Sequence, residues 1–298
     1  MITAPRGLGV ALATPFARDG GVDADALARL TRHVVDGGVD FVVALGSTGE
    51  AGMLDEAERD LVVKTVLENA VRSAVIVGTG SPSTAQAAAW TRRAQQLGAH
   101  GTLVVVPPYV KPSQAGLIAH FQAVAAAASD LPLVLYNVPS RAGANLLPAT
   151  VQALWQVSNI VAIKESSGDL QQIGRIAAEL PPGKALLAGD DALAVATIAI
   201  GGHGLVSVAG NVVPGQMREL VAAARGGNLQ QARRLHTRLL PLFDALFAEP
   251  NPAPVKAALA ALGLTEPIVR LPLLPAGAAV RERLATAMHG ATAEAHHG

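Results

Sequence analysis

Three short apolar runs alternate with two segments of helical composition in residues 160–208, IVAIKESSGDLQQIGRIAAELPPGKALLAGDDALAVATIAIGGHGLVSV. The apolar runs are 160–163, 185–187 and 205–208, and they carry little polar alternation. Strands that are buried on both faces have this pattern. The segments between them, 169–179 and 191–200, have the composition of helices. This alternation predicts a parallel sheet with helices outside it.

The same alternation extends toward the N-terminus. Five further apolar runs come before residue 160, namely 8–13, 41–45, 74–77, 102–106 and 133–136. A helix-like segment follows each run, at 25–36, 54–70, 83–97, 113–128 and 148–157, and Asp55 with Glu58 forms a capping-box pattern in the second. Eight such units predict an α/β fold of the TIM (β/α)8 barrel type. An open sheet would usually carry a Gly-rich dinucleotide fingerprint after its first strand, and none is found there.

The chain continues well beyond the eighth apolar run. Four more segments of helical composition follow, 214–224, 229–247, 254–262 and 276–288. A bare barrel does not need them, so we expect a barrel over residues 1–210 and a C-terminal helical extension over residues 211–298.

The composition excludes several classes of protein. Of the 298 residues 50% are hydrophobic, which excludes a disordered chain. Lys plus Arg and Asp plus Glu are 23 each, so no charge excess favours nucleic acid or an anionic membrane. The absence of cysteine excludes disulfides, cysteine-ligated metals and a thiol nucleophile. Charged residues make up only 15%, which indicates that an oligomer hides part of the surface.

The expected location is the cytoplasm. The N-terminus lacks the basic-then-apolar pattern of a signal peptide. Residues 192–217 carry no formal charge, but Gly201, Gly202, His203 and Gly204 interrupt them, and such a break disfavours a membrane span.

Catalytic residues of a barrel lie where its strands end. Of the five lysines, only Lys164 ends an apolar run. Burial favours the neutral form of an amine, which a Schiff-base nucleophile requires. The alternative is a buried lysine that is paired with a nearby carboxylate.

Other strand ends carry residues suited to acid–base chemistry and to binding carboxylates. Both tyrosines of the chain, Tyr109 and Tyr136, lie there, and a phenol can relay a proton or merely pack. Gly46–Gly49 resembles a backbone anion cradle, or it is a plain turn. Arg141 follows a Pro-Ser turn and could bind a carboxylate, or it is a surface arginine. We find no metal motif, and helix capping explains Asp190–Asp191 better than a cation does.

Six ordered motifs resemble the dihydrodipicolinate synthase and N-acetylneuraminate lyase family of pyruvate-dependent lyases and aldolases. They are GSTGE (46–50), YNVPSR (136–141), IKESSG (163–168), GDD (189–191), GGHG (201–204) and EPNPAPVK (249–256). The resemblance runs from about Gly7 to Pro272. It implies roles for seven residues: a pyruvate imine on Lys164; proton relay by Tyr136, Ser47 and Tyr109; binding of the pyruvate carboxylate by Thr48; a backbone carbonyl facing pyruvate at Val206; and binding of the aldehyde substrate's carboxylate by Arg141.

The residues look most like the branch that condenses pyruvate with L-aspartate 4-semialdehyde to 4-hydroxy-tetrahydrodipicolinate in the diaminopimelate route to lysine. This lyase activity implies no metal and no cofactor besides the covalent pyruvate imine. Because the family's relay tyrosine, here Tyr109, reaches a neighbouring subunit's site, the resemblance also implies a homotetramer built as a dimer of dimers.

Two other functions stay open from the sequence. One is another pyruvate-dependent aldolase, of the N-acetylneuraminate, sugar-acid or hydroxy-oxoglutarate type. Ser47, which stands where the synthase branch commonly has Thr, favours it slightly, and Arg141 disfavours it. The other is a catalytically silent barrel, which the joint presence of Lys164, Tyr136 and Tyr109 disfavours.

One group of residues departs from the resemblance. Members that lysine inhibits line a pocket at the dimer interface with polar and aromatic groups. The matching positions here are Glu56, Arg59, Pro82, Gln86 and Pro108. Because prolines and a changed charge pattern cannot offer the same hydrogen bonds, we expect weak or absent feedback by lysine.

Overall fold

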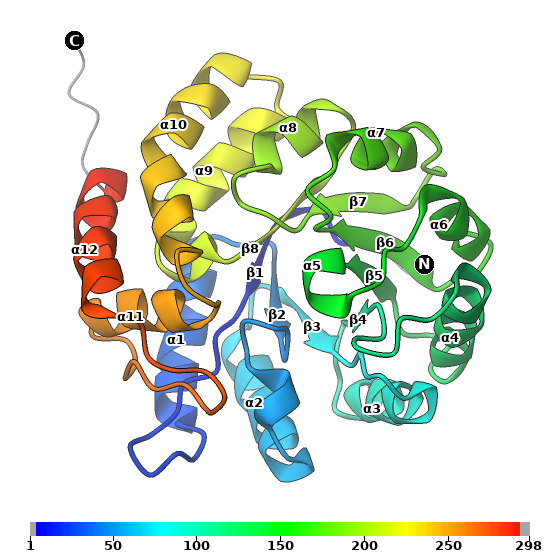
Figure 1. Ribbon diagram of the computed structural model, residues 1–298, viewed down its shortest axis with the longest axis horizontal. Helices are drawn as coiled ribbons and strands as arrows, with labels where there is room; N and C mark the ends of the chain where they lie inside the picture. The colour runs from blue at the N-terminus through cyan, green and yellow to red at the C-terminus, as the bar shows by residue number, and fades with distance from the viewer. Residues whose placement is uncertain (1–3, 293–298) are drawn as a thin grey trace.

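A closed barrel of eight parallel strands forms the centre of the computed structural model, which describes residues 4–292 (Figure 1). The strands are β1 (Gly7–Ala11), β2 (Phe41–Ala44), β3 (Ala74–Gly78), β4 (Gly101–Val105), β5 (Leu133–Asn137), β6 (Ile160–Glu165), β7 (Ala185–Ala188) and β8 (Gly204–Ser207). Each strand pairs with the next along the chain, and β8 pairs with β1. The predicted (β/α)8 barrel is confirmed, with strand bounds within a few residues of those expected.

Helices surround the barrel on its outside (Figure 1). They are α1 (Ala24–Asp36), α2 (Glu56–Asn69), α3 (Thr84–Gln96), α4 (Gln114–Ala126), α5 (Pro139–Ala142), α6 (Pro148–Leu154), α7 (Leu170–Ala178), α8 (Ala194–Ala199) and α9 (Pro214–Arg225), with the short 3-10 helices η1 (Ala51–Met53) and η2 (Ala209–Asn211). The capping box is present: Asp55 accepts from the Glu58 N–H, and the Glu58 carboxylate accepts from the Asp55 N–H. Short helix α5 was not predicted from the sequence.

The barrel interior and the strand–helix interface are separate apolar layers. Alternate residues of β5 illustrate this: Val134 and Tyr136 point inward, whereas Leu133 and Leu135 pack under the outer helices. Because the side-chain period of a strand is two, both sets come from one continuous apolar run. This is why the sequence shows little polar alternation.

Three helices lie beyond the ring of the barrel. Helix α9 contacts β1, β8 and α1 and so belongs to the ring, while α10 (Leu229–Leu246), α11 (Ala253–Ala261) and α12 (Ala278–Thr292) pack beside it. In Figure 1 they lie together on the left, with α10 beside α9. Helices α10 to α12 form the expected C-terminal helical extension. The proposed division of the chain at residue 210 also assigned α9 to that extension, although α9 follows β8 and packs in the ring.

The uncharged stretch 192–217 does not form one helix. It divides into α8, β8, η2 and the start of α9. Within the described residues 4–292, no helix is both long and apolar enough to cross a membrane.

Candidate active site

A cavity of about 220 Å³ opens where the barrel strands end. Its lining brings together five of the seven residues singled out from the sequence, which are Ser47, Thr48, Tyr136, Arg141 and Lys164. They come from three separate parts of the chain, and the barrel closure places them around one cavity.

Lys164 and Tyr136 form the floor of this cavity. The two residues are direct partners on the parallel strands β5 and β6, so both side chains enter the barrel at the same height. Both are buried, and Lys164 Nζ lies 4.1 Å from the centre of the Tyr136 ring. In the described residues Lys164 forms no ion pair. The alternative of a lysine paired with a carboxylate is therefore not supported.

Gly189 makes room for the Lys164 side chain. A Cβ atom at position 189 would lie 2.9 Å from Lys164 Cε and 1.8 Å from Ser166 Oγ. Real Cβ contacts are not that short, so any side chain here would displace the lysine or the serine. The position of the Lys164 side chain on β6 therefore requires a glycine at position 189, directly after β7.

The turn Gly46–Gly49 lies across the cavity from Lys164 and has the geometry of an anion cradle. It begins after Leu45 and ends at Glu50, whose φ angles of 57° and 54° are in the left-handed region. Such a conformation costs about 1–2 kcal/mol for a residue with a side chain. Gly49 is held by its carbonyl, which accepts from Thr14 Oγ1 at 2.7 Å.

Two backbone N–H groups of this turn are available to a ligand. In the part of the chain that the structure describes, the N–H groups of Ser47 and Thr48 have no protein acceptor. Successive free N–H groups in a turn bind anions such as carboxylates. The geometry therefore fits the cradle expected from the sequence.

Arg141 lies at the rim, on the short helix α5 that follows β5. A buried polar network fixes this segment, since Asn137 Nδ2 donates to the Glu165 carboxylate and to Asn145 Oδ1 at 2.8–3.1 Å. Burial raises the pKa of Glu165, against the lowering effect of its hydrogen bonds to Asn137 and Ser167. Arg141 is an exposed residue that lines the cavity, where its guanidinium can bind an anionic substrate.

Two predicted site residues do not line the cavity. Tyr109 is 90% exposed, has a φ angle of 73° and is not part of the cavity lining of its own chain. Val206 lies on β8 with its side chain buried in the barrel interior. On this chain alone, the expected relay from Ser47 to Tyr109 is not assembled.

The structure adds residues that the sequence reasoning missed. Ser166 and Asn251 line the cavity, and each has a buried side-chain oxygen without a partner in the described residues. Asn251 precedes α11, far along the chain, and only its place in the motif 249–256 could have indicated it. The expectation that Asp190–Asp191 cap the following helix is wrong, because the N-cap of α8 is Leu193 and no side chain caps it in the described residues. The buried Asp191 carboxylate instead accepts from the Val208 and Ala209 N–H groups and from Ser207 Oγ.

A second cavity, of about 540 Å³, adjoins the first on the side of α2 and α3. Arg59, Pro82 and Pro108 line it. The buried Arg59 guanidinium donates to the Ala51 and Gly78 carbonyls and stacks on Trp90 at 3.9 Å. Burial lowers the pKa of Arg59 to about 10, so the group stays a cation at neutral pH.

No cluster of three or more potential metal ligands occurs among the residues that the structure describes. The site consists of an amine, hydroxyls, an arginine and backbone N–H groups. This set suits carbonyl and carboxylate chemistry.

Comparison with known proteins gives one consistent result. The model of the dihydrodipicolinate synthetase family matches residues 4–291. A 4-hydroxy-tetrahydrodipicolinate synthase of Thermosynechococcus vestitus is 46% identical over 275 residues, covering 92% of this chain and 93% of the relative.

Solved structures agree with the sequence relatives. A synthase from Cyanidioschyzon merolae with lysine bound has a TM-score of 0.93 at 40% identity, covering 96% of this chain and 98% of that one. The chloride-inhibited enzyme of Acinetobacter baumannii, complexed with pyruvate, has a TM-score of 0.93 at 39% identity and covers 98% and 99%.

Proposed function

We propose that the chain is a lyase that condenses pyruvate with L-aspartate 4-semialdehyde to 4-hydroxy-tetrahydrodipicolinate. The proposal starts from its family, since the chain belongs to the dihydrodipicolinate synthetase family. The product would enter the diaminopimelate route to lysine. One observation carries the proposal. The buried Lys164 amine lies beside Tyr136, across the cavity from the Ser47 and Thr48 N–H groups, and within residues 4–292 the amine has no carboxylate partner and these N–H groups have no acceptor.

The chemistry starts at Lys164. Its neutral amine attacks the pyruvate ketone, and loss of water gives a protonated imine. The imine withdraws electrons, so a methyl proton leaves and an enamine forms. Tyr136, within reach of the amine, is the group we assign to these proton transfers. Enzymes of this family need no cofactor apart from this covalent imine.

Carbon–carbon bond formation uses the second substrate. The enamine carbon attacks the aldehyde of L-aspartate 4-semialdehyde, whose carboxylate we assign to Arg141 at the rim. The substrate's amino group then displaces Lys164 from the imine, which closes the ring and frees the enzyme. We assign the pyruvate carboxylate to Thr48 and the turn N–H groups, and we keep Val206 as the residue whose carbonyl faces pyruvate.

The proton relay requires a second subunit in this proposal. Ser47 lines the cavity, but Tyr109 is exposed and lies outside it. We propose that Tyr109 enters the site of a neighbouring subunit in a homotetramer built as a dimer of dimers, located in the cytoplasm. The exposure of Tyr109 and of the adjacent Val110 supports a contact at this surface.

A coupled assay tests the function. Purified protein is given pyruvate and L-aspartate 4-semialdehyde with the downstream reductase, and Lys164→Ala is the control. We expect turnover that this substitution abolishes. Absence of turnover, from protein that still forms the pyruvate imine, would contradict the proposed aldehyde substrate and leave the imine chemistry in place.

A further inference from the structure

The C-terminal extension is connected to the carboxylate-binding turn through Glu50. This residue ends the turn in a left-handed conformation, and its buried side chain forms an ion pair with Lys256 of α11. Its second carboxylate oxygen accepts from the Arg270 N–H at 2.9 Å. Lys256 is fully buried, donates to the Ile268 carbonyl at 2.8 Å and lies 3.9 Å from the centre of the Phe16 ring.

Asn251 forms a second connection, directly at the cavity. Its Nδ2 donates to Thr48 Oγ1 at 3.0 Å. Its backbone carbonyl accepts from the Arg141 guanidinium at 3.5 Å. Asn251 is 6% exposed and lines the cavity, while its Oδ1 is buried without a partner in the described residues. One residue of the extension thus contacts both residues assigned to substrate carboxylates.

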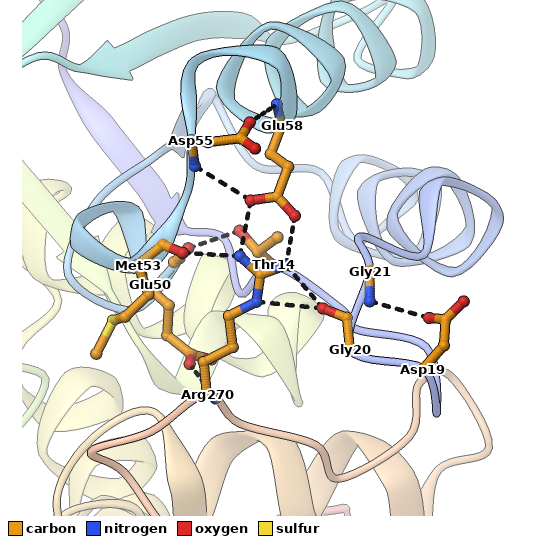
Figure 2. Close-up of polar contacts among 10 residues, drawn as sticks. Thr14, Asp19, Gly20, Gly21, Glu50, Met53, Asp55, Glu58 and Arg270 are labelled. Atoms are coloured by element: carbon orange, nitrogen blue, oxygen red, sulfur yellow. Dashed lines mark hydrogen bonds and ion pairs between the residues drawn. The ribbon is translucent and has the colours of Figure 1, made fainter.

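Arg270 docks the same segment on the barrel, as Figure 2 shows. Its guanidinium forms an ion pair with Glu58 at the start of α2 and donates to the Gly20 and Met53 carbonyls. The segment after α11 is therefore fixed at its far end by contacts that do not involve Ser47 or Thr48. Because the backbone N–H of Arg270 donates to Glu50, only its guanidinium contacts are independent of the turn.

We propose that Asn251 and the Lys256–Glu50 pair are positioning residues for the reaction, which hold the 46–49 turn ready for the pyruvate carboxylate. A hydroxyl has one O–H donor and two acceptor lone pairs. Because the Thr48 oxygen accepts from Asn251, its own hydrogen is directed to the ligand. The ion pair holds Glu50 in its unfavourable backbone conformation. The inference rests on the proposed function, since the ligand of the turn is pyruvate.

Substitution of Asn251 tests its role as a positioning residue. The measured quantity is the pyruvate concentration that gives half-maximal borohydride trapping on Lys164. We expect Asn251→Ala to raise it about tenfold, which corresponds to one lost hydrogen bond. Asn251→Asp should raise it further, because a carboxylate accepts the Thr48 hydrogen and repels the pyruvate carboxylate. The KM for the semialdehyde should change little in the alanine variant.

The double variant Glu50→Gln/Lys256→Met tests the positioning role of the Lys256–Glu50 ion pair. Removing one partner of a buried ion pair leaves an uncompensated charge and can prevent folding, whereas replacing both partners is often neutral for stability. We expect a folded protein with weakened pyruvate trapping. The matched control is Glu58→Gln. It breaks the ion pair between Glu58 of α2 and Arg270 of the segment after α11, and it should leave pyruvate trapping unchanged.

Two results would overturn the inference. The first is a pyruvate affinity in Asn251→Ala equal to that of the wild-type protein. The second is an equal weakening of pyruvate trapping in Glu58→Gln, which would show that the contacts of Asn251 and of the Lys256–Glu50 pair serve only general stability. Trapping of pyruvate by the wild-type protein keeps these results separate from the proposed function. If the wild-type protein traps no pyruvate, the function and the inference fail together.

Discussion

Lys164 and Tyr136 lie side by side on neighbouring parallel strands, with the amine 4.1 Å from the centre of the phenol ring. The strand register places both side chains inside the barrel at the same height. The amine that would attack a ketone and the phenol that would move its protons are thus positioned by backbone pairing rather than by a loop.

Tyr136→Phe removes the phenol hydroxyl and keeps the ring beside the amine. We expect kcat to fall by about 10²–10⁴, the range contributed by a positioned acid–base group. Pyruvate trapping at long incubation should persist, because Lys164 is intact. Steady-state kinetics with trapping as the second readout checks this, and an unchanged kcat would remove Tyr136 from the mechanism.

Gly189→Ala places a methyl group against Lys164 and Ser166. A misplacement of about 1 Å at a reacting group costs about 10²-fold in rate, so we expect a loss of kcat/KM of this order. The control is Gly215→Ala on α9, where a Cβ would meet no atom within 4 Å. Full activity in Gly189→Ala would show that the lysine does not need its present position.

Lysine should inhibit weakly or not at all. Arg59 and two prolines line the cavity beside α2, and the Arg59 guanidinium is already bound to two carbonyls. A second cation there would be repelled, and the prolines offer no N–H groups. Titration of lysine into the coupled assay checks this expectation. Half inhibition at a sub-millimolar concentration would contradict it.

The Glu58–Arg270 ion pair should make stability depend on pH. The hydrogen bond from Arg270 lowers the pKa of Glu58 in the folded state. The pair therefore stabilises the fold above the ordinary pKa of a glutamate, and the contribution is lost as the pH falls through the lowered value. We expect Glu58→Gln to cost about 1 kcal/mol at pH 7. Denaturant unfolding at pH 7 and at a pH below the lowered pKa of Glu58 checks this, since the loss of unfolding free energy in Glu58→Gln should be smaller in acid.

The barrel could be predicted from the sequence because each strand is an apolar run followed by a helix. The position of Lys164 and Tyr136 in one cavity could be predicted because they end such runs, and the strand ends of a parallel barrel face its site. Thr48 and Arg141 were placed by motif, and their positions in the cavity agree with that placement.

Other features could not be predicted because they depend on contacts between distant segments. Asn251 reaches Thr48 across 203 positions of the chain, and no local pattern encodes that meeting. Asp191 looked like a cap for the helix after it, but the barrel closure brings the end of β8 to its carboxylate. Tyr109 follows a strand end in the sequence, yet in the structure it has a left-handed backbone and is 90% exposed.

The central claim is that Lys164 forms an imine with pyruvate, and borohydride reduction followed by peptide mass spectrometry tests it most directly. We predict that protein reduced in the presence of pyruvate carries one carboxyethyl group, on Lys164, and that Lys164→Ala carries none. An unmodified Lys164, or the adduct on another lysine such as Lys256, would contradict the account.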